Sequence, residues 1–228
     1  VAVVFAVVAF IYWPTVAHLL GIGTPPGSTT DAPLVVLVVL ILIWNLHQRL
    51  ALLPIHVFPW GAILVVGLGF VWLGGQLVYT RVFTQLAVLG MVPAVVLTVF
   101  GPKWLRVLGF PFFILLFALP IWGILVPTLV KWSAFFSEMA IRISGVPIYR
   151  DGAYFILPSG SWSIADACSG VAFFSTSLLL GTLYAWTIYE SSRKRALFIL
   201  AAAAIGVIGN WVRVYLTIMI AHISDNRY

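Results

Sequence analysis

The stretch Asp166-Ala-Cys-Ser-Gly170 follows a polar loop rich in turn residues and stands directly before an apolar run, residues 171–186. Cys168, in its middle, is the only cysteine of the chain. This thiol lies at or just before a helix N-terminus, where unsatisfied N–H groups and the helix dipole favour a thiolate. Ser169 and Gly170 are small, so backbone amides there can approach a carbonyl as in an oxyanion hole. We therefore take Cys168 as the candidate nucleophile; the alternative is a small, buried apolar side chain.

Composition sets the class of protein. Of 228 residues, 63% are apolar and 8% are charged, with a mean hydropathy of +1.13. Soluble domains carry roughly 25% charged residues, so we expect an integral membrane protein. One cysteine excludes an internal disulfide framework and a CxxC metal or redox site, and we expect neither cofactor nor metal. The +6 net charge does not indicate nucleic acid, because the few basic residues lie at the ends of apolar runs.

The apolar runs predict an all-α polytopic membrane protein with about seven transmembrane helices. Pro111 and Pro120 predict kinks or a break in the fifth span. We treat residues 1–228 as one transmembrane domain and expect a fragment cut at both ends, because the chain starts without Met and stops shortly after an apolar run. The predicted spans are residues 1–20, 33–46, 57–78, 82–100, 105–125, 167–189 and 196–221.

Residues 126–145 differ from the spans. Lys131, Glu138 and Arg142 recur at spacings of seven and four, which puts them on one helical face. This pattern predicts an amphipathic helix lying at the membrane interface; the alternative is a span that turns its polar face toward other helices. The opposite, apolar face is expected to hold Leu129, Trp132, Phe135, Phe136, Met139 and Ile143.

Residues 147–164 have strand character. The pair Asp151-Gly152 is a strong hairpin signal, and Pro158-Ser-Gly-Ser161 predicts a second turn before a third short strand at 162–164. Open sheet edges are not tolerated against lipid, so this β-hairpin is expected outside the hydrocarbon, directly before Cys168.

The basic residues predict the orientation in the membrane. If residues 126–145 do not cross, three turns on one side hold most of the positive charge, whereas the opposite short turn holds only Arg81. The positively charged side is cytoplasmic, so the hairpin, Cys168 and the end of the last span face outward, toward the periplasm of a Gram-negative bacterium. The basic residues of the cytoplasmic turns are Arg49, Lys103, Arg106, Arg193, Lys194 and Arg195.

Two further side chains are candidates for chemistry. Arg213 lies inside the last apolar run, one turn after Asn210, and a charge there needs a polar cavity or a partner. The alternative to a role in chemistry is that Arg213 merely forms a structural pair with Asp166. Asp166 could instead cap the sixth span. His222 is a weaker candidate. It follows Arg213 by nine residues, so on an unbroken helix the two side chains point to opposite faces, about 13.5 Å apart along the axis. Its alternative is an interfacial histidine at a helix end.

The chain resembles the exosortase/archaeosortase family. The resemblance rests on 145–152 (Gly-Val-Pro-Ile-Tyr-Arg-Asp-Gly), 158–163 (Pro-Ser-Gly-Ser-Trp-Ser), Asp-Ala-Cys-Ser-Gly at 166–170 and Asn-Trp-Val-Arg at 210–213. Residues 219–225 look like the branch that handles proteins with PEP-CTERM tails in exopolysaccharide-producing bacteria. The resemblance implies a cysteine protease and transpeptidase of the bacterial inner membrane, with its site facing the periplasm.

It also implies a catalytic Cys, Arg and His. Cys and Arg transfer onto Cys168 and Arg213, while the third is either His222 or a histidine beyond residue 228. Expected partners are PEP-CTERM-type substrates, membrane lipids and a glycan or lipid amine acceptor. Two other classes of function stay open, a transporter or channel subunit and a scaffold for polysaccharide export; both leave the cysteine dispensable.

Overall fold

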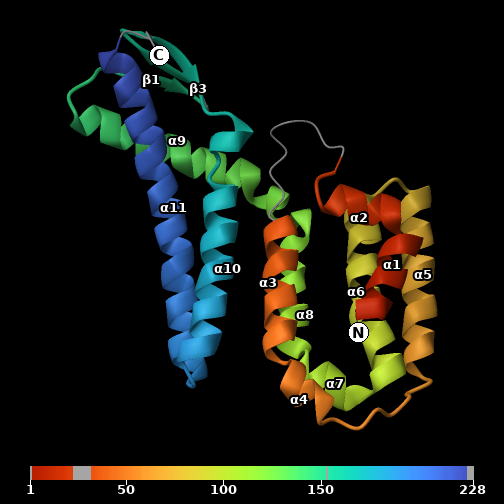
Figure 1. Ribbon diagram of the computed structural model, residues 1–228. Helices are drawn as coiled ribbons and strands as arrows, with labels where there is room; N and C mark the ends of the chain where they lie inside the picture. The colour runs from red at the N-terminus through yellow and green to blue at the C-terminus, as the bar shows by residue number, and fades with distance from the viewer. Residues whose placement is uncertain (1, 23–31, 153, 225–228) are drawn as a thin grey trace. The chain divides into compact units, whose positions relative to one another are not determined.

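The computed structural model describes residues 2–22, 32–152 and 154–224, which are mostly helical (Figure 1). The chain divides into two compact units, Val1–Ile121 and Trp122–Tyr228. The helices of the first unit are α1 (Ala2–Ile11), α2 (Trp13–Leu19), α3 (Ala32–Asn45), α4 (His47–Ala51), α5 (Gly61–Leu77), α6 (Arg81–Phe100), α7 (Pro102–Val107), α8 (Gly109–Leu115) and the 3₁₀ helix η1 (Leu116–Ala118). After η2 (Pro120–Leu125) come α9 (Val126–Ile143), β1 (Tyr149–Asp151), β2 (Tyr154–Leu157), β3 (Gly160–Ser163), η3 (Asp166–Cys168), α10 (Val171–Ile188) and α11 (Ser192–Ile223).

The prediction of a multi-pass helical membrane protein is confirmed, but the count of about seven spans is not. In the described part of the chain, four helices are long and apolar enough to cross: Arg81–Phe100, Pro120–Ile143, Val171–Ile188 and Ser192–Ile223. The predicted second, third and fifth spans form shorter apolar helices, Ala32–Asn45, Gly61–Leu77 and Gly109–Ala118. These are shorter than the ~20 residues that a crossing helix typically needs.

Proline accounts for the largest differences from prediction. The expected single helix over residues 1–20 was wrong, because its described part forms α1 and α2 on either side of Tyr12. Pro14, in the first turn of α2, has no N–H with which to continue the ladder of α1. The predicted break in the fifth span is confirmed: α8 ends in η1, and Leu119 is extended (φ −75°, ψ 140°) directly before Pro120.

In the first unit, α5 and α6 form an antiparallel pair against which α1 and α2 pack. The pair is close because Gly75 has no side chain: a Cβ there would lie 2.9 Å from Thr84 Cγ2. Trp72 on α5 donates a hydrogen bond from Nε1 to Thr15 Oγ1 of α2 (3.0 Å) and meets the Tyr12 ring edge-on at 5.0 Å. These contacts fix α2 beside the α5–α6 pair.

In the second unit, α10 and α11 form an antiparallel hairpin, and α9 runs across both (Figure 1). Glycine allows the hairpin to close. A Cβ on Gly181 would lie 2.6 Å from Ala202 Cβ, and one on Gly206 would lie 2.7 Å from Phe173 O. Small residues at the contact allow membrane helices to approach closely. Close packing matters there because the hydrophobic effect does not drive helices together in lipid.

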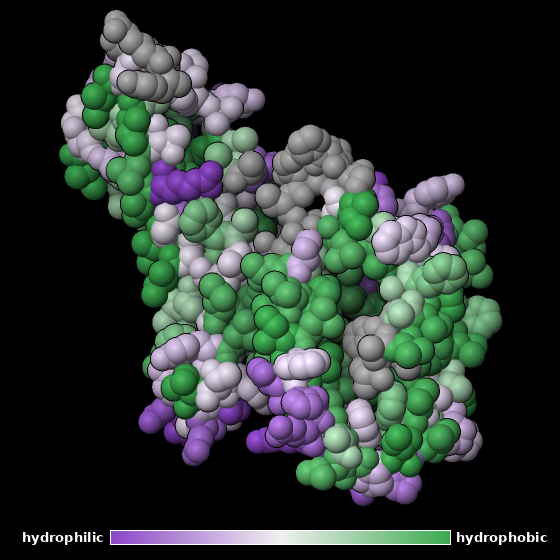
Figure 2. All heavy atoms as spheres, viewed as in Figure 1, coloured by the Kyte–Doolittle hydropathy of each residue, from purple (hydrophilic) through white to green (hydrophobic). Residues whose placement is uncertain are grey.

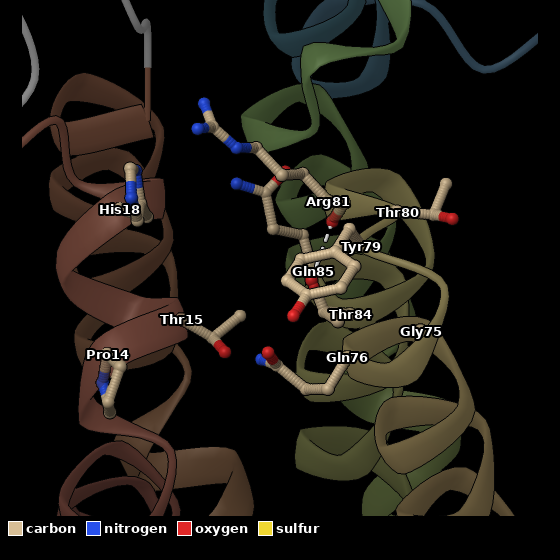
Figure 3. A pocket seen from close by; sticks show the side chains of 10 residues that line it. All are labelled: Pro14, Thr15, His18, Gly75, Gln76, Tyr79, Thr80, Arg81, Thr84 and Gln85. Atoms are coloured by element: carbon tan, nitrogen blue, oxygen red, sulfur yellow. Dashed lines mark hydrogen bonds between the residues drawn. The ribbon is translucent and has the colours of Figure 1, made fainter.

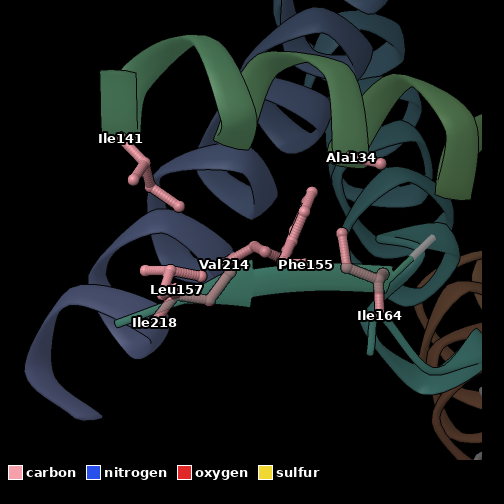
Figure 4. Close-up of a cluster of buried hydrophobic side chains, with 7 residues drawn as sticks. All are labelled: Ala134, Ile141, Phe155, Leu157, Ile164, Val214 and Ile218. Carbon is pink, nitrogen blue, oxygen red and sulfur yellow. The ribbon is translucent and has the colours of Figure 1, made fainter. Parts of the chain in front are cut away.

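The predicted strands are present, including the third short one, and they form a three-stranded sheet. Its order is β1-β2-β3, antiparallel, and the Asp151↔Tyr154 pair closes the first turn, so Asp151 is the last residue of β1 and the turn lies one residue later than the Asp-Gly signal predicts. Along β2 alternate residues are buried, with Phe155 0% and Leu157 4% exposed. Figure 4 shows these side chains packed with α9 and α11. The core cluster consists of Ala134, Ile141, Phe155, Leu157, Ile164, Val214 and Ile218.

The faces of α9 differ from the prediction. Of the expected apolar face only Leu129 is buried; Phe136 is half-buried, and Trp132, Phe135, Met139 and Ile143 are exposed. The face packed into the unit is formed instead by Leu129, Ser133, Ala134, Ser137 and Ile141. The sequence pattern of α9 alone could not show which of its faces packs against the rest of the protein. Lipid is the natural neighbour for an exposed row of this composition.

Apolar side chains also cover the outside of the other long helices, as the hydropathy view of one face illustrates (Figure 2). On α11, for example, Leu197, Leu200, Ile205 and Ile208 are all more than half exposed. The basic cluster Arg193-Lys-Arg195 lies in the first turn of α11, directly after the loop that joins α10 to α11. This alternation of apolar lengths and charged turns is typical of a multi-pass membrane protein.

Candidate active site

The Cys168 thiol lies where η3 meets α10. Cys168 is the last residue of η3, is half-buried, and is a free thiol. Gly170 is the N-cap residue of α10 and has a left-handed backbone (φ 88°, ψ 8°). A Cβ at Gly170 would also lie 2.6 Å from Asn210 Cγ, so both conformation and space require glycine here. The prediction that Asp166 caps the sixth span is therefore wrong, because Gly170 holds that position.

Two buried polar side chains hold the cysteine loop from opposite elements. Asn210 of α11, 1% exposed, donates from Nδ2 to Cys168 O (3.0 Å) and to Ser133 Oγ (3.2 Å). Ser133 of α9, also 1% exposed, donates from Oγ to Ser169 O (3.3 Å). The carbonyls of the loop are thus fixed by side chains of two helices. Rigid support of this kind is what a positioned nucleophile needs.

The backbone amides of the loop are used differently from the prediction. Ser169 N–H donates to Asp166 O (3.1 Å) and Cys168 N–H donates to Ala165 O (2.8 Å), so both amides serve the turn of η3. The predicted oxyanion donor at Ser169 is therefore occupied. Val171 N–H donates to Ser169 Oγ (3.4 Å), so the donors that the local backbone offers instead are the N–H groups of Gly170, Ala172 and Phe173.

Arg213 lies at the same end of the α10–α11 hairpin. It is one turn beyond Asn210, and its guanidinium carbon is 5.5 Å from the centre of the Phe173 ring in the first turn of α10. The alternative pairing with Asp166 is not observed: within the described residues, no carboxylate lies within 4.0 Å of the guanidinium. Arg213 is exposed and held by an aromatic face, so its charge remains available to a ligand.

The structure does not bring His222 to Arg213. The helix α11 runs unbroken from Ser192 to Ile223, so the nine-residue separation puts the two side chains on opposite faces, about 13.5 Å apart along the axis. His222 Nδ1 lies 2.6 Å from Ser159 Oγ, in the turn between β2 and β3. His222 thus joins the end of α11 to the sheet.

Sequence reasoning missed two parts of this arrangement. Ser133 fell on neither predicted face of α9; with Ser137 it forms a pair of small polar residues at i,i+4, a pattern that can signal close helix contact. Glu138 was placed on the polar face without its partner, Arg150 of β1, whose Nε lies 3.1 Å from Oε2. Glu138 also pairs with Arg142 (2.7 Å), so this carboxylate ties the sheet to α9. No group of three or more His, Cys, Asp or Glu side chains gathers around a metal position in the described ranges.

Comparison with known proteins identifies one family. A family model described as transmembrane exosortase matches residues 28–228, which include every part of the site described above. Searches of curated proteins and of solved structures found no match.

Proposed function

The chain belongs to the transmembrane exosortase family, and on that premise we propose that it is a membrane cysteine transpeptidase which cleaves C-terminal sorting tails from exported proteins. The observation that carries the proposal is the cysteine loop: Asn210 and Ser133 hold it at the start of α10, at the hairpin end where Arg213 lies against Phe173. A free thiol before a helix N-terminus, with a cation nearby, is a suitable setting for a nucleophile.

The substrate is a protein with a PEP-CTERM-type tail, whose Pro-Glu-Pro-like segment lies next to a membrane helix. Cys168 Sγ attacks the scissile carbonyl carbon, and the oxyanion is stabilised by Arg213 and by N–H groups at the start of α10. Collapse breaks the C–N bond, and the thiol proton ends on the departing amine. The resulting thioester is attacked by an amine of a glycan or lipid, or by water, which forms the product and restores Cys168.

The placement in the membrane is part of the proposal. We place the protein in the inner membrane, with α10 and α11 crossing and α9 at the periplasmic interface. The crosswise course of α9 supports this, since a helix lying across two spanning helices lies along the membrane surface (Figure 1). Its exposed Trp132, Phe135 and Met139 then face lipid, and Arg193, Lys194 and Arg195 lie on the cytoplasmic side.

The experiment is processing of a tagged PEP-CTERM substrate, produced together with the enzyme in cells and followed by the shift in substrate mass. Cys168→Ala should abolish processing, and Arg213→Ala should slow it by at least about 10²-fold, the usual effect of losing an oxyanion donor. Arg193→Ala is the matched control, because it removes a cation from the other end of α11 and should leave processing unchanged. Processing by Cys168→Ala would favour a transporter or scaffold instead.

A further inference from the structure

A second polar site lies in the first unit and uses none of the residues assigned above. A cavity of about 230 Å³ opens between α2 and the α5–α6 pair. Figure 3 shows side chains from both walls directed into it, among them His18 from α2 and Gln76, Tyr79, Arg81 and Gln85 from the opposite side. Polar lining of this density is unusual between apolar membrane helices, where such residues are costly.

The cavity carries uncompensated positive charge. Arg81 is the first residue of α6, so the positive end of that 20-residue helix opens at the same place. No ion pair to Arg81 occurs within the described residues, and its unit has one acidic residue in total, Asp31, which lies outside them. Thr80, the N-cap residue of α6, makes no side-chain capping bond. The charge and the open helix end together fit an anion.

Gln85 gives an independent indication of a ligand. It is 7% exposed and lines the cavity, and its Oε1 atom is buried with no hydrogen-bond partner within the described part of the chain. A buried acceptor without a donor is rare in folded proteins and costs stability. Tyr79, on the rim, has a left-handed backbone (φ 55°), a conformation that a bulky residue seldom adopts. Both features are expected where a site is shaped for an occupant.

We propose that this cavity binds a phosphate-bearing head group that also carries a hydroxyl or amino donor. The phosphate lies at Arg81 and the N-terminus of α6, and the donor reaches Gln85 Oε1. The volume decides the size of the bound group: sites for drug-sized ligands occupy roughly 300–1,000 Å³, so this one admits a head group and excludes acyl chains. The phosphate ester comes either from a membrane lipid or from a soluble compound.

Calorimetric titration of the purified protein in an uncharged detergent tests the proposal. The probes are dioctanoyl phosphatidylglycerol, dioctanoyl phosphatidic acid, glycerol 3-phosphate and dioctanoylglycerol, which has no phosphate. Arg81→Gln should raise the Kd of both phospholipids at least about tenfold, the usual effect of losing a charged hydrogen bond. Arg49→Gln, which removes a cation of the same unit outside the cavity, should leave each Kd unchanged. Lipid binding without glycerol 3-phosphate binding assigns the source to the membrane; comparable binding of both assigns it to a soluble ester.

Variants of Gln85 distinguish specific binding in this cavity from nonspecific electrostatic attraction of an anion. Gln85→Met should weaken phosphatidylglycerol, which has free hydroxyls, and spare phosphatidic acid, whereas Gln85→Glu keeps the acceptor but should weaken both through repulsion of the phosphate. Thermal unfolding of each variant checks the fold. Equal effects of Arg81→Gln and Arg49→Gln, equal loss of both lipids in Gln85→Met, or dioctanoylglycerol binding as tightly as the phospholipids would each overturn the proposal.

Discussion

Asn210 has two roles in the Asn-x-x-Arg motif. Its amide nitrogen serves Cys168 O and Ser133 Oγ at once, while its side chain fills the space that Gly170 leaves empty. Its Oδ1 stays buried without a partner among the described residues. A residue kept in so specific a polar setting positions the loop; it does not simply fill the core.

Replacing Asn210 tests this role. Asn210→Ala removes both hydrogen bonds and leaves Cys168 O unpaired, so we expect unfolding to become easier by about 1–3 kcal/mol and substrate processing to slow. Thermal unfolding and the processing assay measure the two effects. Asn45→Ala, at the exposed end of α3, is the control and should change neither. An Asn210→Ala enzyme with wild-type processing would show that the loop needs no such support.

We expect His222 to serve the contact with the sheet and not the chemistry. Because α11 is unbroken and His222 meets Ser159, we expect His222→Ala to loosen the β2–β3 turn and to reduce processing only about threefold, within the small effects of surface contacts. The comparison is Cys168→Ala in the same assay. Loss of activity as complete as that of Cys168→Ala would instead make His222 the third catalytic residue.

At the scale of elements, the α10–α11 hairpin supports the site through close backbone approach. A Cβ on Gly206 would lie 2.7 Å from both Phe173 O and Ser177 Oγ, so a larger residue must push the helices apart. We expect Gly206→Val to lower the thermal unfolding midpoint and to shift Arg213 away from Phe173, with loss of processing. Gly209→Val on the same helix has open space around it and is the control. Equal behaviour of the two variants would refute this role for Gly206.

The elements also show what the sequence could predict. The Asp-Gly pair and the apolar alternation of Phe155 and Leu157 are local signals, so the sheet was expected near its observed bounds, although the first turn lies one residue later than the pair predicts. The site was only partly predictable. Cys168 and Arg213 stand out by chemistry, but Ser133 is an ordinary serine until α9 is laid across the hairpin. The capping role expected of Asp166 failed for the same reason, since a glycine was needed to clear Asn210.

At the scale of the whole molecule, the number of spans was the least predictable property. Hydropathy marks apolar runs, but Pro14, Pro111 and Pro120 divide two of them into pieces shorter than a bilayer needs. The proposed sidedness is a simpler matter, because the basic residues 193–195 and the Cys168 loop lie at opposite ends of α10.

That sidedness gives a direct prediction. In intact cells with a permeable outer membrane, a membrane-impermeant maleimide should label Cys168 from the periplasm. A Lys194→Cys variant made in a Cys168→Ala background should react only after the inner membrane is opened, because residue 194 lies at the other end of the hairpin. The reverse pattern of labelling would invert the proposed orientation.

The central claim is that Cys168 carries the substrate as a thioester. The most direct measurement is mass spectrometry of the enzyme isolated from cells that produce a PEP-CTERM substrate, with and without hydroxylamine, which cleaves thioesters. We expect an adduct on the peptide that contains Cys168, with the mass of the substrate truncated at its sorting tail, and we expect hydroxylamine to remove it. Processed substrate in cells whose only enzyme is Cys168→Ala, or an adduct on any other residue, would contradict it.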